Sequence, residues 1–222
     1  MIAAPAPPED LPTRLRIFPL AGAILLPRAV LPLNIFEPRY LAMVRDAMAS
    51  DRLIGIVQPR AGAAGDEPPP VYAVGGLGRV TQFSETGDGR YLIALTGLTR
   101  FRIVEELPVT TAYRQVSADY APYAFDRSEA APLPQVMRAD LEAVLRRYLD
   151  AQNLSADWDA VRAAGDESLV NTLCAVCPFE AAERQALLEA PDLAQRARTL
   201  SALMRFAAES TGPAGTGART VQ

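Results

Sequence analysis

The sequence predicts an α+β protein in which an N-terminal β-barrel domain with one short packed helix precedes a C-terminal α-helical bundle. Up to about residue 122, apolar residues alternate with polar ones or form short runs between turn residues; from about residue 128 they recur at helical spacing. With 222 residues, half of them apolar, the chain is long enough to bury a substantial core. We expect a flexible arm at 1–13, the barrel at 14–122, the bundle at 123–209 and a disordered tail at 210–222.

The barrel begins with an apolar stretch that prolines interrupt, "IFPLAGAILLPRAVLPLNIFEPRY" at 17–40. We expect strands at "LRIF" and "VLPLNIF", joined by an irregular apolar crossing at 23–27. Pro32 has no N–H to donate to a strand ladder, so its strand belongs at an edge or a bulge of the sheet.

A short helix is expected directly after the second strand. Glu37 stands where it can cap this helix, and Pro38 suits the first helical position, where a missing N–H costs nothing. Tyr40, Val44 and Met48 then recur at helical spacing. We expect this helix to pack on the barrel.

The remaining barrel strands are separated by loop and turn signals. Strands are expected at 53–58, 71–85, 90–106 and 112–120, with a proline-rich loop at 59–70. The "TGDG" that ends at Gly89 predicts a hairpin turn. "VGGLGRVT" approaches a dinucleotide fingerprint, but Thr81 stands at the third glycine position and no helix follows, so its glycines indicate barrel bulges.

The C-terminal part predicts four helical segments, at 133–152, 167–177, 179–190 and 193–209. Its "CAVC" motif, Cys174 and Cys177, is a single copy within an apolar periodic run. We interpret both cysteines as small core residues rather than as a redox pair or a zinc site.

The composition excludes much of enzyme chemistry. The chain has no histidine, and all 22 basic residues are arginine, so it also has no lysine. Histidine-dependent triads, the Walker A lysine and Ser-Lys dyads are therefore absent from it. The net charge of −4 does not predict a nucleic-acid surface. The prolines of the opening stretch oppose a transmembrane helix, so we expect a cytoplasmic protein with no membrane partner.

The order of motifs resembles one known family. "FPLAGAILLPRAVLPLNIFEPRYLAMVRDAM", "IGIVQPR", "YAVGGLGRVTQF", "GRYLIALTGLTRFRI" and "LVNTLCAVCPFEAAERQALLEAPDLAQRARTL" are similar to the Lon protease N-terminal, substrate-binding domain family, over roughly residues 14 to 207. The "NIFEPRY" form is most like the stand-alone members of that family, which lack the ATPase and peptidase domains.

The resemblance implies a PUA-like β-barrel with a helical bundle behind it. It also implies a non-catalytic role: the recognition of unfolded or exposed apolar protein segments, as an adaptor or chaperone-like factor, with a separate protease or chaperone as a further partner. Without lysine the chain can supply neither the nucleotide lysine nor the catalytic lysine of a full Lon protease. We expect no catalytic residue, cofactor or metal, and the oligomeric state stays open.

The candidate peptide-binding residues are Leu25, Leu26, Pro27, Phe36 and Tyr40. Irregular backbone carries polar groups that need water, so the two leucines are expected at the surface beside a groove next to the first helix. The alternative is that both leucines plug the barrel end. For the function, the alternative is a small-molecule binding protein with a pocket at the barrel mouth.

Overall fold

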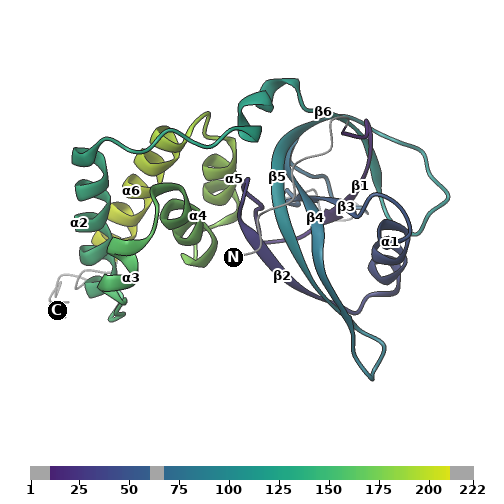
Figure 1. Cartoon of the computed structure of the whole chain (residues 1–222), viewed down its shortest axis with the longest axis horizontal. Helices are drawn as coiled ribbons and strands as arrows, with labels where there is room; N and C mark the ends of the chain where they lie inside the picture. The colour runs from purple at the N-terminus through teal and green to yellow at the C-terminus, as the bar shows by residue number, and fades with distance from the viewer. Residues whose placement is uncertain (1–10, 61–67, 211–222) are drawn as a thin grey trace, which may run out of the picture. The chain divides into compact units, whose positions relative to one another are not determined.

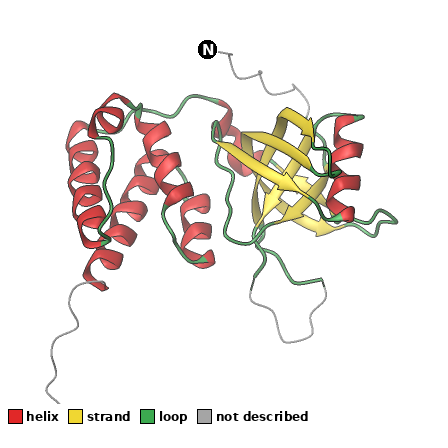
Figure 2. Cartoon of the chain, turned by 90° about the horizontal axis from the view of Figure 1, so that it is seen from below, coloured by secondary structure: helices red, strands yellow, loops and turns green. Residues whose placement is uncertain are grey.

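The computed structural model describes residues 11–60 and 68–210, which form two compact units (Figure 1). The first unit contains Met1–Ala130 and Asn171–Glu189, and the second contains Ala131–Val170 and Ala190–Gln222. The strands come first and most helices follow, which confirms the predicted α+β class (Figure 2). Because the units are defined by contacts in space, the expected division along the chain at residue 122 stays a prediction.

Six strands build the sheet of the first unit. They are β1 (Arg14–Pro19), β2 (Val30–Ile35), β3 (Leu53–Val57), β4 (Val74–Glu85), β5 (Tyr91–Glu106) and β6 (Gln115–Asp119). Their order is β2-β5-β4-β3-β1-β6, and β5 also pairs with β6, so the sheet closes into a ring from which only β2 projects. All pairs are antiparallel except β1 with β3. Pro32 lies in β2 and therefore on an edge strand, as predicted.

The apolar crossing between β1 and β2 lies against the sheet. A Cβ atom added to Gly76 of β4 would stand 1.9 Å from the main-chain oxygen of Leu25, and one added to Gly97 of β5 would stand 2.0 Å from that of Leu26. Only glycine leaves room for so close an approach. Gly76 and Gly78 of the "GGLG" run therefore serve this contact, whereas Gly75 lies against Phe101 and the Ile56 oxygen. β4 also carries irregular register at 77/78.

The expected exposure of the crossing is wrong. Leu25 is 1% exposed and Leu26 is 2% exposed, which matches the alternative that they plug the barrel. The irregular backbone finds partners in the sheet instead of water: the N–H of Arg28 donates to the Gly97 oxygen at 2.8 Å, and the Gly97 N–H donates to the Ala29 oxygen at 2.8 Å. The Asn171 side chain donates to the Pro27 oxygen at 3.0 Å.

Helix α1 (Pro38–Met48) begins where the sequence predicts, with proline in its first turn. Its buried Met43, Val44 and Ala47 join Leu25 in a cluster with strand residues, so α1 covers one face of the sheet. A second cluster, around Phe101, lies on the opposite face of β3, whose successive residues alternate between the two.

Helical segments complete both units. They are η1 (Ala121–Arg127), α2 (Gln135–Ala151), α3 (Trp158–Ala163), α4 (Asp166–Val176), α5 (Ala181–Glu189) and α6 (Leu193–Ser210). Within the described residues, no helix is long and apolar enough to cross a membrane.

Helix α5 is joined to the barrel strands of the first unit by buried polar contacts. Gln185 accepts a hydrogen bond from Gln58 at 3.1 Å and donates one to the Val74 oxygen at 3.0 Å. The buried Arg100 pairs with Asp126 at 2.8 Å and also donates to the Leu188 oxygen at 3.0 Å. Removing one partner of such a pair would leave a buried charge, so these contacts fix the position of α5.

Cys174 and Cys177 are free thiols and are buried, as predicted for core residues. Arg184 lies against the same turn and donates to the main-chain oxygens of Cys177 at 2.8 Å and Phe179 at 2.9 Å. A turn that would otherwise leave carbonyl groups unpaired is thereby satisfied.

In the second unit, α2 packs against α6. The buried residues of α2 recur at helical spacing, and Leu200 and Met204 of α6 are also buried. Those of α2 are Leu141, Val144, Leu145 and Tyr148. Arg138 pairs with Asp166 at 2.9 Å, and Arg205 pairs with Asp140 at 2.6 Å.

Candidate functional site

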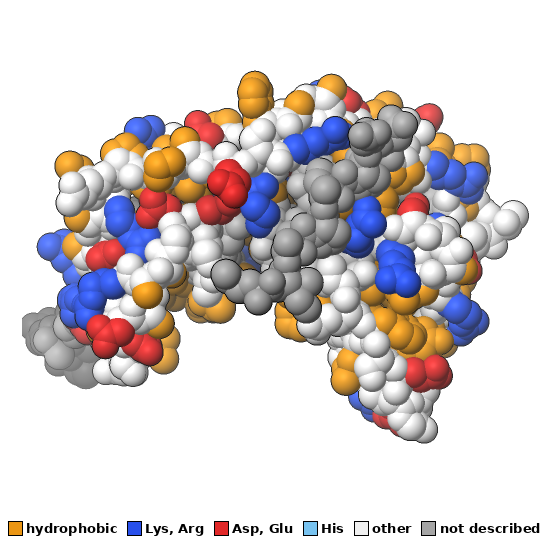
Figure 3. Space-filling view, viewed as in Figure 1, with side chains coloured by type: hydrophobic (Ala, Val, Ile, Leu, Met, Phe, Trp, Pro, Cys, Tyr) orange, Lys and Arg blue, Asp and Glu red, His pale blue; other side chains and the backbone are white. Residues whose placement is uncertain are grey.

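Large exposed apolar side chains gather on a short part of the first unit. Val30 and Phe36 are each 62% exposed, Leu92 is 46% exposed and Phe83 is 42% exposed. They come from β2, the residue after it, and the two arms of the β4–β5 hairpin. Figure 3 shows apolar side chains gathered where this hairpin leaves the body of the barrel. A gathering of this kind marks an interaction site more often than scattered single residues do.

The register of the strands shows on which face of the sheet each of these side chains lies. Pro32 pairs with Ala94 and Asn34 pairs with Leu92, so alternation places all four on one face. On the other face, Ile93 enters the cluster that packs against α1. Phe83 pairs with Ile93 and shares this face, where its ring lies 5.0 Å from the Tyr91 ring, centroid to centroid. The apolar run "YLI" of β5 cannot face the core at every position, and Leu92 is the residue left outside.

A depression of about 640 Å³ lies along β2 and the hairpin, and residues of both faces line it; we call it the hairpin groove. It is lined by Pro32, Leu33, Asn34, Gln82, Phe83, Ser84, Leu92, Ile93 and Ala94. Polar Asn34, Gln82 and Ser84 alternate with the apolar positions. The groove thus offers apolar contact together with side-chain hydrogen-bonding groups.

The edge of β2 borders the groove. Within the described residues β2 pairs with β5 alone, so its other edge has no strand partner. Such an edge can pair with an added extended chain. Pro32 removes one donor from it, which limits uncontrolled strand addition.

A second, smaller pocket of about 330 Å³ lies at the start of α1, and we call it the tyrosine pocket. It is lined by Pro19, Ala21, Arg39, Tyr40, Pro59, Pro68, Pro69, Ala112, Tyr113 and Arg114. The Tyr40 ring lies 4.1 Å from the Phe18 ring, centroid to centroid, and the Arg39 guanidinium lies 4.7 Å from the Tyr40 centroid. The Tyr113 hydroxyl donates to Asp46 at 2.6 Å.

Both tyrosines of this pocket stay neutral at physiological pH. Burial is the main cause that raises the pKa of Tyr40 above its ordinary value. Burial also raises the pKa of Tyr113, and the hydrogen bond to Asp46 raises it further. The pocket therefore presents phenol rings and guanidinium groups, a combination that suits an aromatic or proline side chain rather than acid–base chemistry.

Glu37 occupies the N-cap position of α1, but its side chain makes no capping hydrogen bond. It pairs with Arg39 at 2.7 Å instead, so the expected side-chain cap does not form.

The five predicted peptide-binding residues fall into two groups. Leu25, Leu26 and Pro27 are buried in the crossing, where they cannot contact a ligand directly. Phe36 is exposed and Tyr40 lines the tyrosine pocket. Their role in binding stays a prediction.

Phe83 and Leu92 were not among the predicted site residues. The signal that could have found them is their position beside the "TGDG" turn, where β4 continues past the end of its pairing with β3. Among the described residues, no group of three or more Cys, Asp or Glu side chains is arranged to hold a metal ion.

Comparisons with known proteins agree with this architecture. A family model described as the ATP-dependent protease La (LON) substrate-binding domain matches residues 14–205. The chain is 35% identical over 113 residues to "Lon protease 2" of Myxococcus xanthus, covering 47% of this chain and 13% of that protein. It is 29% identical over 216 residues to "Lon protease 2" of Sorangium cellulosum, covering 89% of this chain and 25% of that protein.

The chain thus spans a quarter or less of the length of these two relatives. Its fold is similar to that in a crystal structure of a Lon N-terminal domain protein from Xanthomonas campestris. The TM-score is 0.61 at 24% identity, over 86% of this chain and 98% of the other.

Proposed function

Because the chain belongs to the family of ATP-dependent protease La (LON) substrate-binding domains, we propose that it recognises protein substrates by binding exposed apolar segments of unfolded chains. The observation that supports this most is the hairpin groove, where Phe83 and Leu92 lie exposed beside an unpaired strand edge. Unfolded chains expose apolar side chains and free backbone groups together. The apolar side chains of the groove can contact the former, and the strand edge beside it can pair with the latter.

In the proposed mode, an extended segment lies along β2 and the hairpin. Its apolar side chains contact Leu92, Ala94 and Pro32, while Asn34 and Gln82 hydrogen-bond its backbone. Burying one leucine-sized side chain contributes about 1.5–3 kcal/mol. A few such contacts, reduced by the ordering of the segment, give weak and sequence-tolerant binding.

The tyrosine pocket adds a place for one side chain. We propose that Tyr40 and Tyr113 receive an aromatic or proline residue of the bound segment, and that Phe36 contacts the segment from the exposed turn before α1. Leu25, Leu26 and Pro27 then act only by holding the sheet in shape.

Binding without cleavage is part of the proposal. The chain contains no lysine and no histidine, so the Ser-Lys and Ser-His mechanisms of peptide hydrolysis have no base in it. Purified protein is expected to leave an unfolded substrate intact with or without ATP. ATP-dependent cleavage by clean material would contradict this.

The test of the groove is fluorescence anisotropy of a labelled, permanently unfolded protein titrated with the full chain, with a folded protein as control. We expect the double substitution Phe83→Ser and Leu92→Ser to weaken binding to the unfolded protein roughly tenfold, which corresponds to about 1.4 kcal/mol. A matched variant carries Val136→Ser and Phe206→Ser, which remove two even more exposed apolar residues from the second unit.

Selective binding of the unfolded protein that only the first variant weakens would support the hairpin groove. Equal weakening by both variants, or no binding at a protein concentration of about a tenth-millimolar, would overturn it.

A further inference from the structure

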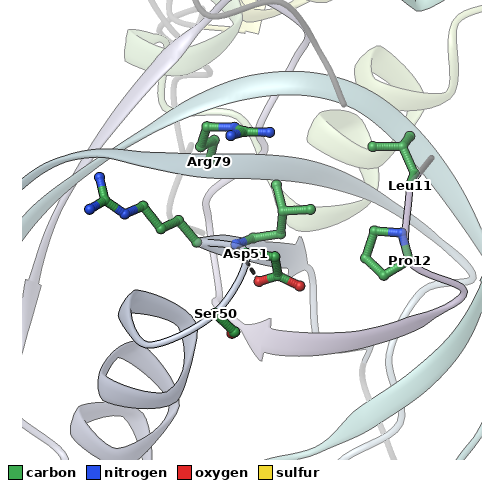
Figure 4. Close-up of a pocket in the computed structure, with 7 residues that line it drawn as sticks. Leu11, Pro12, Ser50, Asp51 and Arg79 are labelled. Carbon is green, nitrogen blue, oxygen red and sulfur yellow. Dashed lines mark hydrogen bonds between the residues drawn. The ribbon is translucent and has the colours of Figure 1, made fainter. Parts of the chain in front are cut away.

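A third pocket lies at the end of α1, away from the two surfaces assigned above, and its arginines are not used by the proposed function. It has a volume of about 600 Å³ and is lined by Leu11, Pro12, Ser50, Asp51, Arg52, Leu53 and Arg79 (Figure 4). We propose that this arginine pocket binds a carboxylate carried on a small apolar group, such as the C-terminal residue of an apolar peptide.

The turn between α1 and β3 builds one wall. The N–H of Arg52 donates to the Ala47 oxygen at 2.9 Å, and the Arg52 oxygen accepts from the Val80 N–H at 2.8 Å. Arg52 has a positive φ of 61°, the left-handed conformation that ends many helices. Held on both sides, this residue has a fixed backbone from which its guanidinium extends.

The acidic residue of the pocket is already neutralised. Asp51 accepts hydrogen bonds from Arg16 at 2.6 Å and from the Leu53 N–H at 3.0 Å. Arg16 also donates to the Ser50 hydroxyl at 2.7 Å. Asp51 is therefore committed to Arg16 and to the turn, and it does not neutralise the other arginines.

Among the residues that the structure describes, no acidic side chain compensates Arg52 or Arg79. Neither side chain makes a hydrogen bond or an ion pair with any residue that the structure describes. The Nε atom of Arg79 is moreover buried without an acceptor. An unpaired buried donor is costly to keep, and a ligand that accepts from it removes that cost. Figure 4 shows the Arg79 guanidinium extending in the direction of Leu11.

The opposite wall is apolar and fixed. Leu11 and Pro12 form it, and the Tyr120 hydroxyl holds it by donating to the Pro12 oxygen at 2.9 Å. Leu53 adds a buried apolar side chain. Guanidinium groups bind carboxylates through a forked pair of hydrogen bonds, and an apolar wall beside them favours an anion with a short hydrocarbon group over a bare inorganic ion.

The test is an NMR titration of the full chain that follows the arginine Nε–Hε signals. The probes are N-acetyl-leucine, N-acetyl-leucinamide, which lacks the carboxylate, and inorganic phosphate, which lacks the apolar group. We expect N-acetyl-leucine to shift the Arg79 signal with a Kd on the order of 1 mM. The amide and phosphate are each expected to bind at least about tenfold more weakly.

Arg79→Gln and, separately, Arg52→Gln should each weaken N-acetyl-leucine binding roughly tenfold. Arg52 is exposed, so its variant remains informative if Arg79→Gln fails to fold. Arg147→Gln, at an exposed position on α2, is the matched control and should change nothing.

Equal binding of N-acetyl-leucine and N-acetyl-leucinamide would overturn the proposal that the pocket recognises a carboxylate. Equal binding of N-acetyl-leucine and phosphate would overturn the proposal that the ligand needs an apolar group. Binding that both arginine variants leave unchanged would overturn the site. None of these outcomes depends on whether the hairpin groove binds unfolded protein, so the two proposals fail separately.

Discussion

The crossing at residues 23–27 and the β4–β5 hairpin both carry apolar side chains. The irregular crossing is the buried one of the two, and the regular hairpin is the exposed one. The crossing has no secondary structure, and its Leu25 and Leu26 are almost fully buried; the hairpin is regular, and its Phe83 and Leu92 are about half exposed. Regular backbone satisfies its own polar groups and can stand in water without cover. The irregular crossing is buried because Gly76 and Gly97 let its main chain reach the sheet. Exposure thus follows what lies opposite a segment rather than the type of its backbone.

The strongest test of this comparison shortens the two leucine side chains of the crossing. Leu25→Ala and Leu26→Ala should each lower the free energy of unfolding by about 2–5 kcal/mol, because each leaves a cavity that the fixed sheet cannot fill. Denaturant-induced unfolding followed by circular dichroism measures this. The exposed Leu92→Ala is the control and should cost clearly less. A crossing variant as mild as the hairpin variant would contradict the assignment of both leucines to the core.

A smaller loss of stability is expected when the sheet, rather than the crossing, is changed where the two are in contact. Gly97→Ala should destabilise by about 1–3 kcal/mol, since its added methyl group meets a main-chain oxygen rather than a side chain that can turn away. Gly87→Ala, in the hairpin turn, has no atom within 4 Å of the added Cβ and should be close to neutral. Thermal unfolding of the two variants gives the comparison directly. Equal melting temperatures would show that the crossing does not need the glycine.

The smallest effect concerns the tyrosine pocket, whose Tyr40 and Tyr113 belong to the same cluster as Leu25. The pKa of Tyr113 is raised in the folded protein above its ordinary 10.0, chiefly by burial and then by the hydrogen bond to Asp46. The folded state therefore holds the phenol proton more firmly than the unfolded state does. This contribution to stability is complete below pH 10.0 and is lost as the pH rises through the raised value.

The free energy of unfolding should accordingly fall above about pH 10, and Tyr113→Phe should make that fall shallower. At neutral pH the same variant loses one hydrogen bond, at a cost of about 0.5–1.5 kcal/mol. Unfolding by denaturant at a series of pH values measures both. Asp46→Asn removes the second cause and leaves burial, so it should retain most of the alkaline loss. Identical pH profiles for wild type and Tyr113→Phe would contradict the role given to burial.

Local signals in the sequence were sufficient for much of this fold. Pro38 marks the start of α1, "TGDG" marks the hairpin, and Pro32 marks an edge strand; each depends only on the backbone needs of one residue and its neighbours. The burial of Leu25 and Leu26 could not be predicted in this way, because it depends on Gly76 and Gly97 far along the chain.

The same limit applies to the candidate sites. Phe36 and Tyr40 were found because they flank a recognisable helix start. Arg52 and Arg79 line the same pocket because β3 pairs with β4 in one particular register, with Leu53 opposite Arg79. No spacing in the sequence indicates this arrangement. Sites made by strand register are therefore the ones that require the structure.

Residues 131–170 of the second unit separate the two stretches of chain that form the first unit. The barrel strands lie in Met1–Ala130, and the partners of Gln58 and Arg100 on α5 lie in Asn171–Glu189. Ribosomes deliver the chain from its N-terminus, so the six strands emerge while α5 is still unsynthesised. Until it emerges, Gln58 lacks its partner Gln185, and Arg100 lacks the Leu188 oxygen. On a nascent chain these polar groups are left to water, and the contacts between the barrel strands and α5 form only in the last quarter of translation.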